Sequence, residues 1–248
     1  RVGYRTGYPS DRNDGALWQG KGVTAAFYLG SGVSLGRVSV ALHPTIFWAE
    51  NRDFSLWPVF FNGQPEEAYP FRWIDWPQRM DDGSFWSIGP GESELSVRLG
   101  GWMAGLSSRN RSWGPGLENS IVLGESAGGF PHAFLSTAGP LSTSLGGFET
   151  QWLFGRLSRS SVFLPGEKDP GRYVTGVIVV WSPPSGLEGL HMGAALMKYG
   201  PWLEQGWDMV SDVFRAGAED QSDQLGSIFF RWVLPKSGFE LYAELARN

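Results

Sequence analysis

The sequence of 248 residues contains no cysteine and only three histidines, His43, His132 and His191. Without cysteine the chain can form neither a disulfide framework nor a Cys-ligated zinc site, and it has no thiol nucleophile. The histidines lie far apart in the sequence, so we expect no histidine-rich metal site and no cofactor. Charged residues make up only 18% of the chain, the net charge is −5, and Lys and Arg do not cluster. This charge pattern argues against nucleic acid as a partner.

The two ends of the sequence suggest a segment of a longer protein. The chain begins at Arg1 rather than Met, and Asn248 follows directly on an alternating pattern. No leader typical of a signal peptide is present, and no apolar run approaches the length of about 18 residues that a membrane-spanning helix needs. We expect residues 1–248 to be a single domain, with a signal peptide, an N-terminal plug and further C-terminal strands lying outside the sequence.

Glycine and aromatic residues are abundant, with 35 Gly, 16 Phe and 13 Trp, and their arrangement predicts strands. Side chains alternate between two faces of a strand, so a period of two residues indicates β-structure. In 33–43, Val38, Val40 and Leu42 alternate with small or polar residues. In 143–157, aromatic side chains alternate with Glu149 and Gln151 in the same way. One stretch, 201–216, has apolar residues at helical spacing instead: Leu203, Trp207, Val210 and Phe214.

Tight turns alternate with long connections along the chain. The expected hairpins are 22–29 with 33–42 through Gly30–Gly32, 174–181 with 187–199 through PPSG, and 225–234 with 239–246 through PKSG. The expected long connections are 43–94, 158–173 and 200–224. A consistent strand direction requires 119–124 and 131–137 to be separate strands with a turn at 125–130, which gives about ten strands.

This pattern predicts an all-β fold, an incomplete antiparallel outer-membrane β-barrel with long external loops and a short helix near 201–216. The alternative is a soluble β-sandwich, but the strand length and the contrast between polar and apolar faces favour the barrel. Aromatic residues lie near strand ends, as in the girdles of such barrels: Trp48, Trp102, Tyr173, Trp181, Tyr199 and Trp202. The polar side chains expected to face the lumen are Glu149, Gln151, Glu240 and Glu244, with Arg37, Arg98, Arg156 and Arg231 as partners. Charge pairing in the lumen is favoured over a transport pathway.

The sequence Gly124–Gly128 (GESAG) matches G-x-S-x-G, the nucleophile elbow of α/β-hydrolases. The elbow requires a helix directly after the serine, yet Gly128, Gly129 and Pro131 follow Ser126. No βαβ alternation is present. A serine esterase is therefore a remote alternative, and we expect no enzymatic activity.

Motifs in 105–163 resemble the capsule assembly Wzi family of outer-membrane proteins. The elements that carry this resemblance are Trp113, Gly114, Pro115 and Gly116, then Asn119, then Phe130, Pro131 and His132, and Gly155 with Arg156 and Leu157. Weaker similarity lies upstream, as in Glu50-Asn51, and downstream in 239–244. The resemblance implies a large outer-membrane barrel with an N-terminal helical plug. It implies a lectin-like role, in which capsular polysaccharide is held on the surface of a Gram-negative cell.

The region 43–94 is the candidate polysaccharide-binding loop because it combines tryptophan with carboxylates. Aromatic faces stack on sugar rings and carboxylates accept sugar hydroxyls. The candidate residues are Trp57, Trp73, Trp76, Trp86, Asp75, Arg79, Asp81 and Asp82. The alternatives are tryptophans that only pack the barrel mouth, an internal Asp75–Arg79 ion pair, or a glycosidase, for which no carboxylate pair of defined separation is evident. For Trp113–Gly116 a structural turn packed in the lumen, near the periplasmic end, is favoured over a sugar platform.

Together these features predict a non-catalytic, monomeric protein of the bacterial outer membrane. Its partners would be capsular or other surface polysaccharide and the membrane lipid. The main alternative is a passive porin-like or structural barrel.

Overall fold

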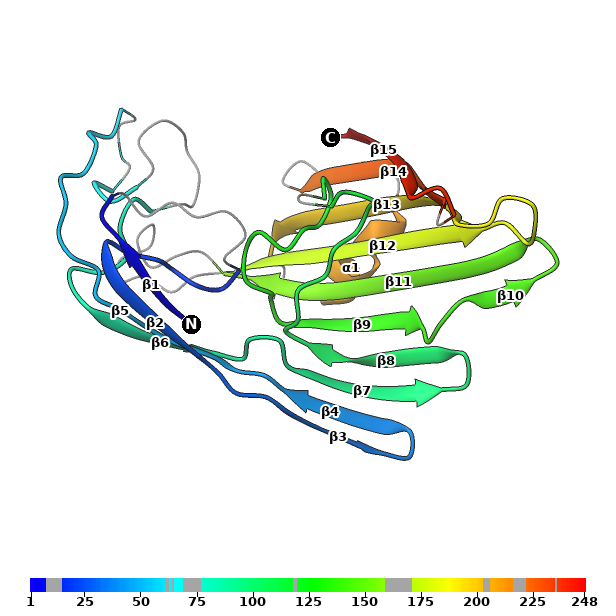
Figure 1. Ribbon diagram of the computed structural model, residues 1–248, viewed down its shortest axis with the longest axis horizontal. Helices are drawn as coiled ribbons and strands as arrows, with labels where there is room; N and C mark the ends of the chain where they lie inside the picture. Colours follow the sequence, from blue (N-terminus) through cyan, green and yellow to red (C-terminus); the bar gives the residue numbers. More distant parts are fainter. Residues whose placement is uncertain are drawn as a thin grey trace.

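The computed structural model describes residues 1–7, 15–60, 63, 65–68, 77–117, 120–158, 171–202, 206–215, 222–234 and 236–248. These residues form an all-β structure with two antiparallel sheets and one short helical segment (Figure 1). The predicted fold class is confirmed to this extent. Among the described residues the sheet does not close on itself, because β3 and β15 lie at opposite ends of the strand order.

The large sheet has eleven strands and is mostly a meander, in which strands that follow one another in the sequence are hydrogen-bonded neighbours. Its order is β15-β14-β13-β12-β11-β9-β8-β7-β4-β3, with β10 paired to β11 off this path. The bounds are β3 Ser31–Leu35, β4 Val38–Leu42, β7 Glu94–Leu99, β8 Trp102–Ser107, β9 His132–Thr137, β10 Leu141–Thr143, β11 Gly146–Leu157, β12 Arg172–Ser182, β13 Leu190–Pro201, β14 Asp223–Leu234 and β15 Phe239–Arg247.

The small sheet has the order β1-β2-β5-β6 and extends one end of the large sheet (Figure 1). Its strands are β1 Val2–Arg5, β2 Gly22–Tyr28, β5 Thr45–Ala49 and β6 Phe85–Gly89. β2 continues into β3 in one direction, and β4 continues into β5, because β2 pairs with β5 while β3 pairs with β4. The predicted hairpin through Gly30–Gly32 is therefore wrong. The chain reverses at Gly36, whose φ of 60° suits a glycine in a tight turn.

Tight turns and long connections lie at opposite ends of the large sheet, as predicted (Figure 1). The hairpins β12–β13 and β14–β15 form at the predicted places. Residues 120–124 form no strand, so the prediction of a strand over 119–124 is wrong for the described residues. The connection between β8 and β9 runs over 108–131, and its described residues form no strand. Val122 and Leu123 pack in the main core, and Leu123 forms only an isolated bridge with Trp113. The predicted strand 143–157 is also divided, because the chain turns between β10 and β11.

The register gives the large sheet two faces of opposite chemistry. We call the face that carries the 108–131 connection the inner face, and the opposite one the outer face. Large apolar side chains cover the outer face, and many are exposed: Val33, Leu35, Val38, Leu42, Leu95, Leu99, Trp102, Leu106, Leu135, Val179, Met192, Ile228, Phe239, Leu241 and Leu245. The predicted alternation in β4 and β11 is confirmed. Tyr199, expected in an aromatic girdle, lies instead on the inner face, opposite Asp223.

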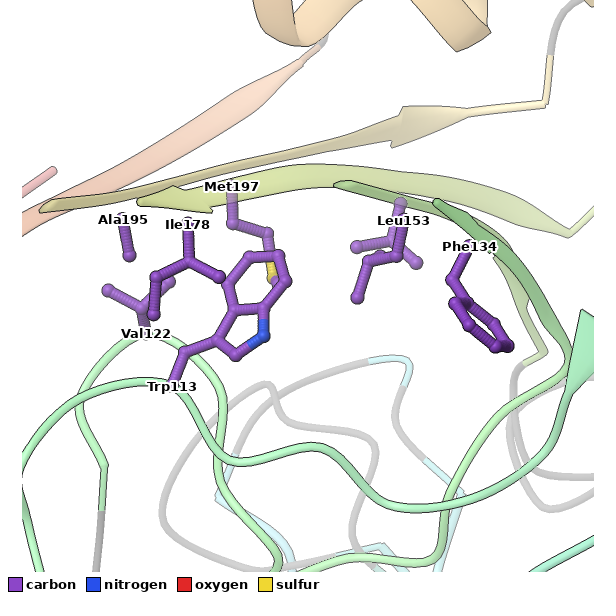
Figure 2. Packing of buried hydrophobic residues seen from close by; sticks show 8 residues of the cluster. Trp113, Val122, Phe134, Leu153, Ile178, Ala195 and Met197 are labelled. Atoms are coloured by element: carbon purple, nitrogen blue, oxygen red, sulfur yellow. The ribbon is translucent and has the colours of Figure 1, made fainter. Parts of the chain in front are cut away.

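The main core lies between the inner face and the 108–131 connection (Figure 2). Trp113 and Val122 of the connection pack against buried residues of the strands, among them Leu153, Ile178 and Met197. Two regions of the chain that would otherwise expose apolar surface thus cover each other. A second, smaller core lies on one face of the small sheet, where Leu17 and Trp18 pack against Ala26, Phe47 and Ala49.

The helical segment consists of α1, Gly206–Ser211, and the 3-10 turn η1, Asp212–Phe214. It lies across the sheet from Trp113, on the outer face, where it contacts β12 and β13 (Figure 2). The prediction of a helix near 201–216 is confirmed, but the side chains that the helix buries are not the predicted apolar residues at helical spacing. Met209, Asp212 and Val213 are buried, whereas Trp207 and Phe214 are exposed, and Leu203 lies outside the described residues. No helix among the described residues combines the length and apolarity needed to cross a membrane.

Candidate functional site

The predicted binding region 43–94 is less irregular than expected. It contains β5 and β6, and the described residues of the connection between them, 50–84, form no helix or strand. Asn51 anchors this connection from a buried, left-handed position with a φ of 48°. Its side-chain amide donates to the carbonyl oxygens of Asp81 and Gly83 at 3.2 and 3.0 Å, and to that of Met80. One buried amide therefore holds the end of the connection against its beginning.

Trp57 is the predicted sugar-stacking tryptophan of this connection that lies among the described residues. Its side chain is half-exposed, and Gln78 fixes its backbone by accepting from the Trp57 N–H at 2.9 Å and donating to its carbonyl at 3.0 Å. Phe60 nearby in the sequence is exposed as well. Arg79 pairs with Asp53 at 2.6 Å, and the Asp53 carboxylate remains largely open to solvent. Exposed aromatic rings and a carboxylate thus occur in one braced segment.

The other predicted binding residues do not form a single cluster around Trp57. Asp81 and Asp82 are exposed at the turn that Asn51 holds. Trp86 is not a loop residue: it lies in β6, directly opposite Trp48 of β5, and stacks on Phe27 with ring centroids 6.2 Å apart. Trp73, Asp75 and Trp76 lie outside the described residues, so the predicted Asp75–Arg79 pair is not tested.

The stretch Trp113–Gly116 packs on the inner face and belongs to a long connection. Its predicted place near the end with the tight turns is therefore wrong, because that prediction depended on a strand at 119–124. The Trp113 indole N–H donates to Oε1 of Gln151 at 2.9 Å, and its ring lies against Gly176. Gly114 has a φ of 118° and sits beside the Glu244 carboxylate. The stretch is thus a structural turn held between β11 and β15. This supports its interpretation as a packed turn and not as a platform for sugars.

The second group of motif residues, Phe130, Pro131 and His132, connects this covering segment to β9. His132 is buried on the inner face, and its Nδ1 lies 2.7 Å from the carbonyl oxygen of Phe130. Beside it Arg111 pairs with Glu94 at 2.6 Å, and its guanidinium lies 4.9 Å from the centroid of the Phe134 ring. Asn119 lies outside the described residues. The motif therefore marks the attachment of the 108–131 connection to the sheet, with His132 as its buried residue.

Most of the predicted lumen charges lie on the inner face, but one does not. Glu149, Gln151, Glu240 and Glu244 share the inner face, and Arg231 pairs with Glu240 at 2.7 Å. Arg156 faces the outer side, because it lies opposite Tyr173 and five residues from Gln151 in a strand of period two. Its assignment to the lumen is wrong for this reason.

The G-x-S-x-G sequence lacks the geometry of a nucleophile elbow. Ser126 lies in an irregular stretch where Ala127 forms an isolated bridge with Gly15, and the chain then continues through 128–131 into β9. The next element after the serine in the described part of the chain is the strand β9, so no helix directly follows it. Across all the residues that the structure describes, no group of three or more His, Asp or Glu side chains is placed to hold a metal ion.

A cavity of about 340 Å³ lies where the small sheet meets the 108–131 connection. Its lining includes Tyr28, Thr45, Glu92 and Asn110, and the Glu92 carboxylate accepts from the backbone N–H of Asn110 at 3.1 Å. These residues lie in four separate stretches of the sequence, so no local pattern could have predicted the cavity.

Comparisons with protein-family models, with curated proteins and with solved structures gave no match. A function for the chain therefore has to be inferred from the two faces of the sheet and from the loops at its ends.

Proposed function

We propose that this chain forms part of the wall of a bacterial outer-membrane β-barrel that attaches or helps assemble surface polysaccharide. The membrane location in this proposal rests on the exposure of large apolar side chains on the outer face. Leu35, Leu106, Ile228 and Leu245, on four different strands, expose between 61% and 74% of their surface. Soluble monomers rarely expose apolar patches larger than a few hundred Å². An apolar face that extends across the whole sheet suits a hydrocarbon environment.

Two further features support a barrel wall over an exposed face of a soluble sandwich. The inner face carries Glu149, Arg231, Glu240 and Glu244, so the polar and apolar sides have the arrangement of a barrel with a wet interior. Tight turns at one end and long connections at the other are also typical of outer-membrane barrels. The 108–131 connection covers part of the inner face, which favours a filled interior over a passive porin-like channel.

The polysaccharide part is supported by the 50–84 connection and by the resemblance to the Wzi family. Trp57 and Phe60 expose aromatic rings, and Asp53 exposes a carboxylate, at the end of the sheet where the long connections gather. Flat aromatic faces and carboxylates are the groups that recognise the C–H surfaces and hydroxyls of sugars. Because Gln78 and Asn51 fix the backbone of this connection, its side chains are held in place before a glycan binds.

The membrane part is tested by labelling single cysteines, since the natural chain has none. The full chain carrying Ile228→Cys is labelled with an environment-sensitive fluorophore and refolded into phosphatidylcholine vesicles that contain lipids spin-labelled in the acyl chain. Glu149→Cys, exposed on the inner face, is the matched control. We expect strong quenching at position 228 and little at position 149. Equal quenching at both positions, or none at 228, contradicts a lipid-facing outer surface.

The polysaccharide part is tested with surface polysaccharide extracted from the cells that carry the gene. Trp57→Ala is compared with Trp102→Ala, an exposed tryptophan at the opposite end of the sheet. Loss of one aromatic anchor is expected to weaken binding by roughly tenfold, whereas the control should bind as the natural chain does. Unchanged binding by a folded Trp57→Ala variant contradicts the assignment of this connection to the glycan.

A further inference from the structure

The outer face of the large sheet carries charge only near one end. Among the described outer-face positions of its strands the charged side chains are Arg156, Lys198 and Arg247, and all three are cations. Arg156 is one residue from the end of β11, Lys198 is three from the end of β13, and Arg247 is the last residue of β15. All three strand ends lie on the side of the long connections. Of the three, Arg156 and Arg247 are exposed, and these two cations border the apolar surface on this side.

Lys198 is fully buried because α1 and η1 cover it. Its Nζ donates to the carbonyl oxygen of Arg215 at 2.8 Å and lies 3.6 Å from Oδ1 of Asp212. The Tyr173 hydroxyl donates to the other carboxylate oxygen of Asp212 at 2.8 Å. This buried network fastens the helical segment to the outer face, since breaking a buried ion pair leaves an uncompensated charge.

The fastened segment turns its largest aromatic side chains outward. Trp207 is 77% exposed and Phe214 is 69% exposed, and Trp202 just before the segment is 40% exposed. The Arg156 guanidinium lies 5.2 Å from the centroid of the Trp202 ring. Aromatic rings beside cations are the composition found where a membrane protein crosses the headgroup layer of a bilayer.

The distance along the strands fits this position. On β13 the outer-face residues from Leu190 to Leu196 are uncharged, and Lys198 lies eight residues beyond Leu190. At about 3.3 Å per residue this is about 26 Å along the strand, or about 20 Å along the membrane normal for a tilt of about 40°. That height approaches the apolar band of about 25 Å in outer-membrane barrels.

A groove leads from the apolar band to Arg156. It has a volume of about 550 Å³, and its lining includes Val40, Leu42, Leu95, Leu106 and Phe154. Arg156 and Trp202 also line it, as does Glu94, whose carboxylate is paired with Arg111 at 2.6 Å. An apolar groove with a cation at its boundary matches a lipid that has acyl chains and an anionic headgroup.

We propose that Arg156, Trp202, Trp207, Phe214 and Arg247 form a rim that binds the phosphate-bearing headgroups of an anionic lipid leaflet and sets the depth of the strands in the membrane. This inference rests on the proposed membrane function and adds the chemistry of the leaflet at the end with the long connections. The two exposed arginines on the strands of this face are complementary to phosphate, and the exposed rings suit the headgroup layer.

The test compares lipids near the rim. The full chain with Trp207→Cys, labelled with a fluorophore, is refolded into phosphatidylcholine vesicles doped with headgroup-labelled quencher lipids, either phosphatidylglycerol or phosphatidylcholine. We expect phosphatidylglycerol to be enriched near position 207 by at least about fivefold, the order expected for one arginine at an anionic surface. Adding R156Q and R247Q should abolish the enrichment. As a control, R37Q and R98Q are added to the Trp207→Cys chain instead. These changes remove two cations that lie near the end with the tight turns and not on the outer face, so the enrichment should be unchanged.

The outcomes separate this inference from the proposed function. If position 228 is quenched by acyl-chain labels but position 207 shows no preference for phosphatidylglycerol, the rim is wrong and membrane insertion stands. If the preference survives in the R156Q/R247Q variant, the rim is also wrong. If neither position 207 nor 228 is quenched, the membrane function fails, and the rim fails with it.

Discussion

The indole N–H of Trp113 reaches Oε1 of Gln151 over 2.9 Å and so ties the long 108–131 connection to the middle of β11. The tryptophan is only 3% exposed, and its ring lies on Gly176 of β12. A connection that could have extended into solvent therefore lies flat on the inner face. This contact lies within the main core, where the loop and the sheet cover each other's apolar side chains (Figure 2).

Replacing Gln151 by methionine removes the acceptor but keeps the side-chain length. The buried N–H of Trp113 then has no acceptor at this position, and we expect the free energy of unfolding to fall by about 1–3 kcal/mol. Urea unfolding in detergent micelles measures this change. Trp113→Phe combined with Gln151→Met should cost less than the sum of the two single changes. If the two costs simply add, the hydrogen bond does not contribute as stated.

Gly176 leaves room for the Trp113 ring. A Cβ atom at this position would lie 2.8 Å from one ring carbon of Trp113 and 2.9 Å from another. Gly176→Ala should therefore displace the ring and lower the free energy of unfolding by about 1–3 kcal/mol. Gly226 of β14 is the matched control, because a Cβ there meets its nearest neighbour only at 3.5 Å. Equal stabilities for the two alanine variants would show that the ring is not closely packed on β12.

The fold was predictable where the information is local. Period-two alternation gives the face of Val38 or Trp152 without knowledge of the partner strand, and the turns PPSG and PKSG mark reversals by their composition. Local information failed at Ile121–Leu123, since an apolar triplet can pair as a strand or pack on a sheet, and only the tertiary structure decides which. Glycines at 30–32 suggested a reversal, yet the pairing of β2 with β5 carries the chain straight on.

Site prediction from sequence had the same limit. Trp57 and Arg79 could be selected because tryptophan and charge are concentrated in 43–94, but composition did not distinguish Trp57 in the connection from Trp86 in a strand. The cations of the outer face were not recognised, because Arg156 was assigned to the lumen. The alternation along the strand could have shown this, because residues an even number of positions apart share a face. Arg156 therefore lies on the same face as Trp152 and Phe154.

Asn51 is expected to control the order of the predicted glycan-binding connection. Its buried amide donates to three carbonyl oxygens at 80–83, and its φ of 48° is one that asparagine tolerates better than most residues. Asn51→Ala should cost about 2 kcal/mol locally and expose 77–84 to proteases. Limited proteolysis with mass spectrometry locates the cleavage. Asn110→Ala is the control: it loses one exposed hydrogen bond to Ala127 and should not alter cleavage in 77–84. Similar cleavage in both variants would contradict the role of Asn51.

Glu50 should make the join between β2 and this connection sensitive to acid. Its carboxylate accepts from the backbone N–H of Val23 at 2.8 Å and pairs with Arg52 at 2.6 Å, and these contacts lower the pKa of Glu50 below its ordinary value. Because the folded pKa is the lower one, the stabilisation is complete above the unfolded value of about 4.3 and is lost as the pH falls through the folded pKa. Hydrogen exchange at the Val23 amide, corrected for its intrinsic rate and followed from about pH 6 to about pH 3, should lose protection in that window. Glu50→Gln keeps an acceptor oxygen but cannot titrate. In this variant the protection of the Val23 amide should be weaker at neutral pH and independent of pH. If protection in the natural chain is also independent of pH, the carboxylate is not the cause.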